Sequence, residues 1–129
     1  MKPPKWSTAQ WREANATLEA RSGGKCEACG VAFKTGDRTA RHHRQRRAVG
    51  GDRLSNILLI HDACHLQIHA HPESSRESGH IVSVYVDDPS SIPVSYQRRT
   101  RVLLSDLGSL SEAPERSQSA AAPDLGASL

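Results

Sequence analysis

The sequence has few of the residues that build large hydrophobic cores. Aromatic residues make up 4% and hydrophobic residues 36% of its 129 positions, with a single Phe and a single Met. A core this small rarely stabilises a domain on its own, so a structural metal or a disulfide is expected. The length indicates one domain, since domains of roughly 100–150 residues are the most common.

Long apolar runs are also missing. No segment approaches the roughly 18 consecutive apolar residues of a transmembrane helix, and the opening MKPPKW does not lead into the apolar stretch of a secretory signal peptide. We therefore expect a soluble protein of the cytoplasm with no membrane contact. In that compartment a CxxC pattern indicates metal binding or redox chemistry more often than a disulfide. Moreover, three cysteines cannot all pair with one another.

The net charge of +3 hides an uneven distribution of charge. Residues 1–54 carry a net charge of +7, and residues 55–129 carry −4. Six arginines lie within sixteen positions, namely Arg38, Arg41, Arg44, Arg46, Arg47 and Arg53. Such a cluster is typical of a phosphate-binding surface. A solvated loop is the alternative interpretation.

The N-terminal residues 1–24 predict a helix. Ser7 followed by Gln10 forms a capping-box pattern at its start, and Gly23 and Gly24 supply a stop. The apolar residues of the segment share one helical face: Trp11, Ala14 and Leu18. We expect this face to pack on the rest of the domain.

Residues 25–72 predict a compact unit of two strands and a helix. It opens with CEACG, the pattern of a zinc knuckle. A strand over residues 39–44 and an apolar strand over residues 57–60 are expected to follow. A helix is expected from His61 to about Ala70, ending before Pro72.

Beyond residue 72 the pattern is weaker. Residues 73–104 contain HIVSVYV and most of RRTRVLLSD, which favour strands and suggest an accessory hairpin. Residues 105–129 are rich in Ser, Ala and Pro and predict a disordered tail.

The cysteines and one histidine predict a zinc site. Cys26 and Cys29 form one pair, and His61 and Cys64 form a second pair with the same spacing. Structural zinc prefers four such ligands, supplied as two close pairs. This set uses every cysteine of the chain. A redox-active CxxC is the alternative, although the βαβ context typical of one is missing.

A second group of histidines remains after that assignment. His65 and His69 are spaced i, i+4 on the predicted helix, which suits a metal but also fits an exposed polar face. His42 and His43 lie on the first strand, where neighbours point to opposite faces and so have different roles. Asn56 precedes the second strand. The order is thus His, Asn and His on a strand–strand–helix unit.

The segments RHHRQRR, GGDRLSN and LLIHDACHLQIH resemble the HNH endonucleases of the ββα-metal superfamily, in particular small zinc-stabilised members from bacteriophages and actinobacteria. The resemblance covers about residues 21–71. It implies a small zinc-bound, treble-clef-like ββα-metal core. With the N-terminal helix, the accessory C-terminal hairpin and the disordered tail predicted above, the expected fold class is α+β. It also implies metal-dependent hydrolysis of DNA to 5′-phosphate and 3′-hydroxyl ends.

The resemblance implies a role for each matching residue. His43 would be the general base, which a neutral imidazole suits near neutral pH. His42, His65 and His69 would hold a catalytic divalent ion, and Asn56 would orient the loop and the base. The DNA backbone would contact the arginines of the cluster: Arg41, Arg44, Arg46, Arg47 and Arg53.

Two positions depart from the usual family pattern. His61-x-x-Cys64 stands where a second CxxC is usual, and His42 stands where an acidic residue is common. The nitrogen-rich site should favour Mn²⁺, Co²⁺, Ni²⁺ or Zn²⁺ over Mg²⁺, because imidazole prefers the later transition metals. His71 and His80 receive no role and are expected on the surface.

The alternative function is a non-catalytic zinc module that binds nucleic acid. A redox or metal-sensing protein built on the thiols is a third possibility. As partners of a nuclease we expect DNA and, by the resemblance, phage terminase or other packaging proteins. The same resemblance predicts a monomer in the cytoplasm of a bacterial or phage-infected host cell.

Overall fold

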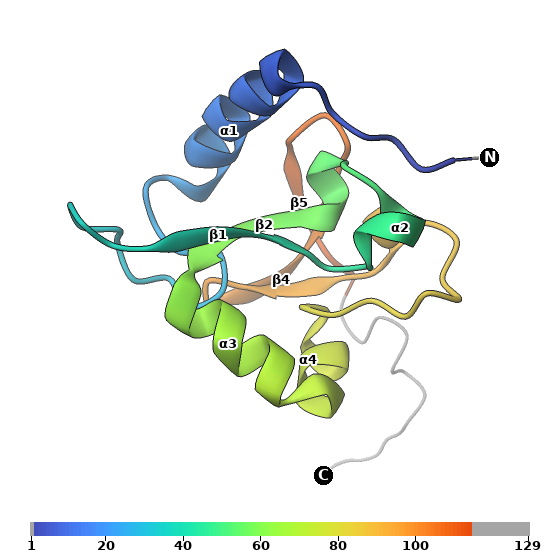
Figure 1. Cartoon of the computed structure of the whole chain (residues 1–129). Helices are drawn as coiled ribbons and strands as arrows, with labels where there is room; N and C mark the ends of the chain where they lie inside the picture. The colour runs from blue at the N-terminus through green and yellow to red at the C-terminus, as the bar shows by residue number, and fades with distance from the viewer. Residues whose placement is uncertain (1, 115–129) are drawn as a thin grey trace, which may run out of the picture.

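A computed structural model describes residues 2–114 and has a small mixed α+β fold (Figure 1). The helices are α1 (Thr8–Ser22), α2 (Arg47–Gly50), α3 (Asp62–Ala70) and α4 (Pro72–Ser78), with 3-10 turns at Leu54–Asn56 and Pro89–Ser91. The strands are β1 (Thr39–His43), β2 (Ile57–His61), β3 (Val94–Tyr96), β4 (Thr100–Leu104) and β5 (Leu110–Glu112). They form two antiparallel sheets, β1–β2 and β3–β4–β5.

The predicted N-terminal helix is present as α1, with the predicted caps. The Ser7 hydroxyl accepts a hydrogen bond from the Gln10 amide at 3.2 Å, and the Gln10 side chain accepts one from the Ser7 amide at 2.8 Å. At the other end Gly23 adopts a left-handed conformation with φ 67°, which suits glycine. Ala14 and Leu18 lie on the buried face of the helix.

Strand β2 is the centre of the packing. Ile57 and Leu59 pack with Leu18 of α1, whereas Leu58 and Ile60 face a second cluster that includes Ile68 of α3. Alternation along the strand thus gives each face its own helix, and Figure 1 shows α1 above and α3 below the hairpin. Burial on both faces explains why the residues from 57 to 60 are a continuous apolar run.

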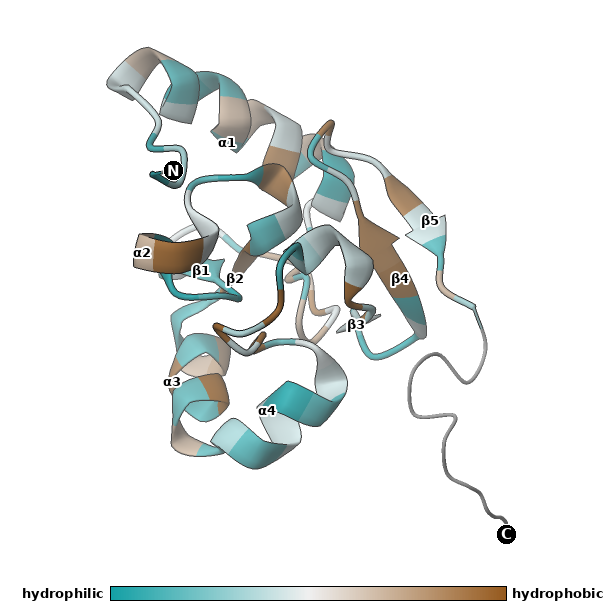
Figure 2. Ribbon diagram, turned by 90° about the vertical axis from the view of Figure 1, so that its right-hand side faces the viewer, coloured by the Kyte–Doolittle hydropathy of each residue, from teal (hydrophilic) through white to brown (hydrophobic). Residues whose placement is uncertain are grey.

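The C-terminal part differs from the sequence prediction in two places. Residues 81–88 form no strand, and Gln45 holds this segment by donating to the carbonyls of Ser83 and Val86, each at 2.8 Å. The expected tail does not begin at residue 105, because Leu110–Glu112 form β5, which pairs with β4. Residues 115–129 of that predicted tail lie outside the described residues. β4, largely brown in Figure 2, buries Val102 and Leu104.

A buried carboxylate joins four parts of the fold. Glu27 forms an ion pair with Arg21 of α1, with N–O distances of 2.6 and 2.8 Å. It also accepts from the Leu59 amide of β2 at 2.7 Å and from the Tyr96 hydroxyl of β3 at 2.7 Å. Both side chains of the ion pair are almost completely buried. Every oxygen of Glu27 therefore has charged or polar donors, as burial of a carboxylate requires.

Replacing Glu27 by Gln should destabilise the protein strongly. The Arg21 guanidinium would keep its charge in a buried position without a counter-ion, and loss of one partner of such a pair costs about 3–5 kcal/mol. Urea unfolding of the zinc-loaded protein measures this cost. The double variant Arg21→Met, Glu27→Leu should recover part of it; a loss below about 1 kcal/mol in the single variant would contradict the importance of the pair.

Candidate functional site

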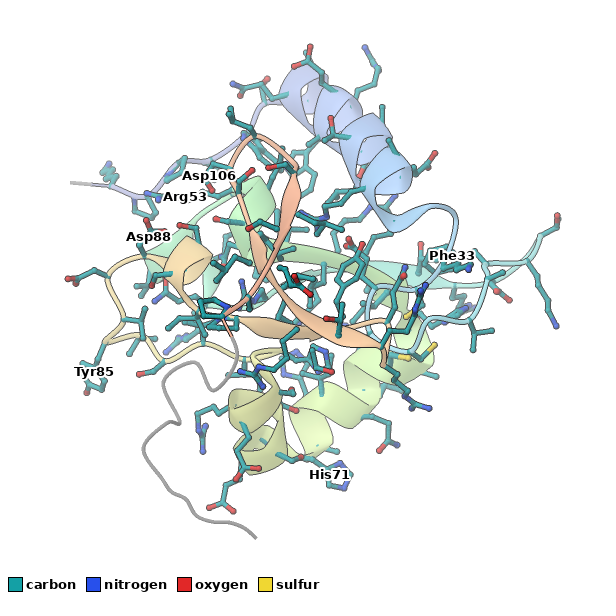
Figure 3. All side chains as sticks on the ribbon, turned by 180° about the vertical axis from the view of Figure 1, so that it is seen from behind. Phe33, Arg53, His71, Tyr85, Asp88 and Asp106 are labelled. Atoms are coloured by element: carbon teal, nitrogen blue, oxygen red, sulfur yellow. The ribbon has the colours of Figure 1, made fainter. Side chains whose placement is uncertain are left out.

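Three segments bring four metal-binding side chains together. Cys26 and Cys29 follow α1, His61 is the last residue of β2, and Cys64 lies in the first turn of α3. Their donor atoms all lie within 4.8 Å of one another. In Figure 3 the sulfur atoms gather at one end of α3. The helix begins at Asp62 rather than at His61, so His61 joins the cluster from the strand.

The spacing of these donor atoms suits a tetrahedral zinc ion. The sulfurs of Cys26 and Cys64 are 3.8 Å apart, and the sulfur of Cys29 lies 3.6 Å from Nδ1 of His61. Zn–S bonds of about 2.3 Å and Zn–N bonds of about 2.0 Å at tetrahedral angles give S–S and S–N separations of roughly 3.8 and 3.5 Å. None of the three cysteines forms a disulfide. The cluster could therefore hold a structural zinc.

The surroundings of the cluster also suit a cation. Nε2 of His61 lies 3.2 Å from a carboxylate oxygen of Asp37, the outer partner that metal-bound histidines commonly have. Burial, and next the neighbouring Cys26, raise the pKa of the Cys64 thiol to about 12. A divalent cation would reverse this effect, because it stabilises the thiolate form directly.

A second cluster consists of His42, His65 and His69. Their ring centroids are 5.1 Å (His42 to His65), 5.4 Å (His42 to His69) and 4.7 Å (His65 to His69) apart. One ring nitrogen from each lies within 4.8 Å of the others. Strand β1 supplies the first histidine, and successive turns of α3 supply the other two. Three imidazoles at this spacing form a donor set that fits a transition-metal ion.

His42 is held in a state that can bind a cation. Its Nε2 lies 2.6 Å from the carbonyl oxygen of His80, so Nε2 carries the proton and Nδ1 is free as a ligand. Burial lowers the pKa of His42 to about 4; the hydrogen bond to His80 opposes this, and His65 and His69 add to it. Burial, and next His69, also lower the pKa of His65. Neutral imidazoles are the form that coordinates metals.

His43 has partners on the other face of β1. Its Nε2 lies 2.9 Å from Oδ1 of Asp52, and its ring packs edge-on near Trp11 with centroids 6.4 Å apart. His43, His42 and His69 all border one pocket of about 450 Å³. The two adjacent histidines therefore have different contacts and share one pocket. A second pocket, of about 460 Å³, lies beside Cys29 and Cys64 and is lined by none of the clustered histidines.

Asn56 is completely buried and organises the loop between β1 and β2. Its side chain accepts from the Gln45 amide at 2.7 Å and donates to the carbonyls of Gln45 at 2.9 Å and Gly51 at 3.0 Å. These bonds link the two ends of the loop that Asn56 was expected to orient. The side-chain hydrogen bonds of Asn56 within the described residues do not reach His43 itself.

The prediction that Arg44 binds DNA is wrong, because its side chain is buried. It is 2% exposed, and its guanidinium donates to the carbonyl oxygens of Gly79 at 2.8 Å, Ser55 at 2.9 Å and Ile92 at 2.7 Å. A buried guanidinium with its donors engaged cannot contact a phosphate. Nothing in the spacing of the arginines indicates which of them turns inward.

The other four predicted arginines are at least partly exposed. Three of them have protein partners: Arg41 with Asn15, Arg47 with Asp52, and Arg53 with Asp106, the last pair labelled in Figure 3. Arg46 borders the histidine pocket, as does Arg76 of α4. Neither of these two side chains forms a hydrogen bond or ion pair with other described residues. Both are therefore available to an anion.

Sequence reasoning missed several residues around the two clusters. Asp37, Asp52 and Arg76 had no assigned role, because only the folded chain brings them near the histidines. His80 was expected on the surface, yet it is partly buried and its Nε2 lies 2.9 Å from the carbonyl oxygen of Ser95. His71 is exposed as expected and labelled in Figure 3. Metal-bound histidines commonly contact an outer carboxylate, and this tendency is the one signal that could have suggested Asp37.

The structure thus defines a small mixed α+β protein with a Cys3His cluster that could bind zinc. Comparison with family models, curated proteins and solved structures found no match. Among residues 2–114, no helix has the length and apolar character needed to cross a membrane.

Removal of one ligand should cost the protein its zinc. Cys64→Ser should lower zinc content from about one ion per chain and reduce the unfolding midpoint, because structural zinc stabilises small folds directly. His61→Cys is the matched control, since it keeps four ligands and should retain the ion. Elemental analysis and thiol titration measure both. Wild-type protein that purifies without zinc and with oxidisable thiols would contradict the assignment.

Proposed function

We propose that this protein is a metal-dependent endonuclease of the HNH type that hydrolyses DNA. One observation carries the proposal: His42 and His69 border the same pocket as His43, while His65 completes their nitrogen cluster. The pocket thus combines a candidate cation site with a separate imidazole that has its own partners. A purely structural metal site does not need that second imidazole.

The arrangement of the backbone supports the same proposal. Antiparallel strands β1 and β2 pair His42 with Leu58 and His43 with Ile57, and α3 follows β2 directly. This is the strand–strand–helix order that the resemblance implies for a ββα-metal core. The Cys3His cluster sits at the β2–α3 junction, where it would fix the direction of the helix that carries His65 and His69.

Each group near the pocket has a function in phosphodiester hydrolysis. His43 would take a proton from the attacking water. Arg46 and Arg76, both exposed, would bind phosphate oxygens of the DNA backbone. A divalent ion at His42, His65 and His69, when bound, supplies Lewis-acid stabilisation of the phosphate and of the leaving 3′ oxygen. Asn56 would keep the loop between β1 and β2 in place.

The second cluster should bind later transition metals in preference to Mg²⁺. Titration calorimetry of zinc-loaded protein should show tighter binding of Ni²⁺ or Co²⁺ than of Mg²⁺, because the donors are imidazole nitrogens. His69→Ala should weaken Ni²⁺ binding by about tenfold or more. His71→Ala removes an exposed histidine outside the cluster and is the control. Equal Ni²⁺ affinity in the two variants would argue against this site.

Cleavage of plasmid DNA tests the proposed reaction. Wild-type protein should nick or cut DNA in the presence of Mn²⁺, Co²⁺, Ni²⁺ or Mg²⁺. His43→Ala should reduce the rate by about 10²–10⁴-fold, the usual contribution of a positioned general base. DNA affinity and zinc content should stay near wild type, because His43 belongs to neither cluster. His71→Ala should cleave at the wild-type rate.

The same experiment separates the alternative function. A zinc module that only binds nucleic acid would use Arg46 and Arg76 but would need no base, so wild-type protein would bind DNA without cutting it in any metal. If His43→Ala cuts as fast as wild type, the assignment of His43 as the base is wrong.

A further inference from the structure

Asp52 is a buried carboxylate with four donors and no role in the site described so far. Its Oδ1 accepts from Nε2 of His43 and from Nε of Arg47, each at 2.9 Å. Its Oδ2 accepts from a terminal nitrogen of Arg47 and from the Trp6 amide, each at 2.8 Å. The side chain of Asp52 is fully buried. Both oxygens are therefore fixed in direction.

These contacts also keep Asp52 ionised. Burial opposes ionisation, but the hydrogen bonds from Arg47, His43 and Trp6 together hold the pKa of Asp52 below its usual range. An ionised carboxylate can only accept hydrogen bonds. The ring nitrogen that faces it must therefore be the one that carries the proton.

This requirement decides which nitrogen of His43 can act as a base. With the proton on Nε2, the lone pair is on Nδ1, and Nδ1 has no hydrogen-bond partner among the described residues. We propose that Asp52 is a positioning residue that fixes His43 in the Nε2–H tautomer and leaves Nδ1 to accept a proton from water. This role rests on the proposed nuclease function.

The N-terminal segment holds Asp52 in place. The Asp52 amide donates to the carbonyl oxygen of Pro4 at 2.8 Å, while the Trp6 amide bonds the carboxylate. Gly51 has φ 74°, and a Cβ at this position would lie 2.6 Å from Pro4. Trp6 packs edge-on against Trp11 with centroids 4.9 Å apart, and Trp11 in turn packs near His43. Residues 3–6 therefore pack on Gly51 and hold Asp52, the partner of His43, through two hydrogen bonds.

The Asp52→Asn variant tests the role. An amide can donate as well as accept, so it no longer enforces one tautomer. In a catalytic Asp–His pair of a serine protease, this exchange lowers kcat by about 10⁴-fold; here we expect a loss of kcat on the order of 10²-fold or more, with little change in KM. Asp87→Asn removes an exposed carboxylate that forms no hydrogen bond or ion pair with other described residues, and it is the control for charge.

A spectroscopic readout separates positioning from mere stability. Nitrogen-15 spectra of the imidazole rings, recorded near pH 8 on the zinc-loaded full chain, report the tautomer of His43 directly. Wild-type protein should show the Nε2–H form, and Asp52→Asn should show a mixture or the Nδ1–H form. Zinc content and the urea midpoint confirm that the variant is folded.

The outcomes distinguish the two proposals. A wild-type His43 in the Nδ1–H form overturns the role of Asp52 even if the variant does not fold. Asp52→Asn that cuts DNA like wild type, while His43→Ala does not cut, also overturns it and leaves the nuclease function intact. Wild-type protein that cuts no DNA overturns the nuclease function and this role with it.

Discussion

The fold depends on the buried ion pair between Arg21 and Glu27. Glu27 lies between the two cysteines of the knuckle, so its bonds to α1, β2 and β3 fix the knuckle relative to all three. Its backbone carbonyl also accepts from the Gln97 amide in the β3–β4 turn. A single side chain thus sets the position from which Cys26 and Cys29 meet His61 and Cys64. In a chain with so small an apolar core, this charged group fixes the relative positions of elements that apolar packing fixes in proteins with larger cores.

The Cys3His cluster and the cluster of three histidines both depend on the junction between β2 and α3. His61 ends β2, and within four residues α3 presents Cys64 to one cluster and His65 to the other. Adjacent helical positions are turned by about 100°, which is enough to aim the two side chains at different sites. The geometry of the histidine cluster is thereby tied to that of the cysteines, and disorder at the junction would affect both.

Local and patterned features could be predicted from the sequence. The capping box of α1, the apolar strand β2 and the four ligands of the cysteine cluster each have a signal of spacing or period that the chain carries on its own. The nuclease roles of His42, His43, His65 and His69 stay predictions. The burial of Arg44, the bond from His43 to Asp52 and strand β5 were missed, because each depends on contacts between segments distant in the sequence.

The inward turn of Arg44 and Gln45 has an effect on the segment from residue 79 to residue 92. This stretch lacks strand pairing, and the two side chains bind its carbonyl oxygens instead. A carbonyl is common to every amino acid, so the path of the segment is specified from outside it. The exposed side chains of Val84 and Tyr85 are therefore not needed to hold the segment, and both residues can change without altering the path of the backbone. Val84 also borders the histidine pocket, so the border of the pocket can change at this position while the backbone keeps its path.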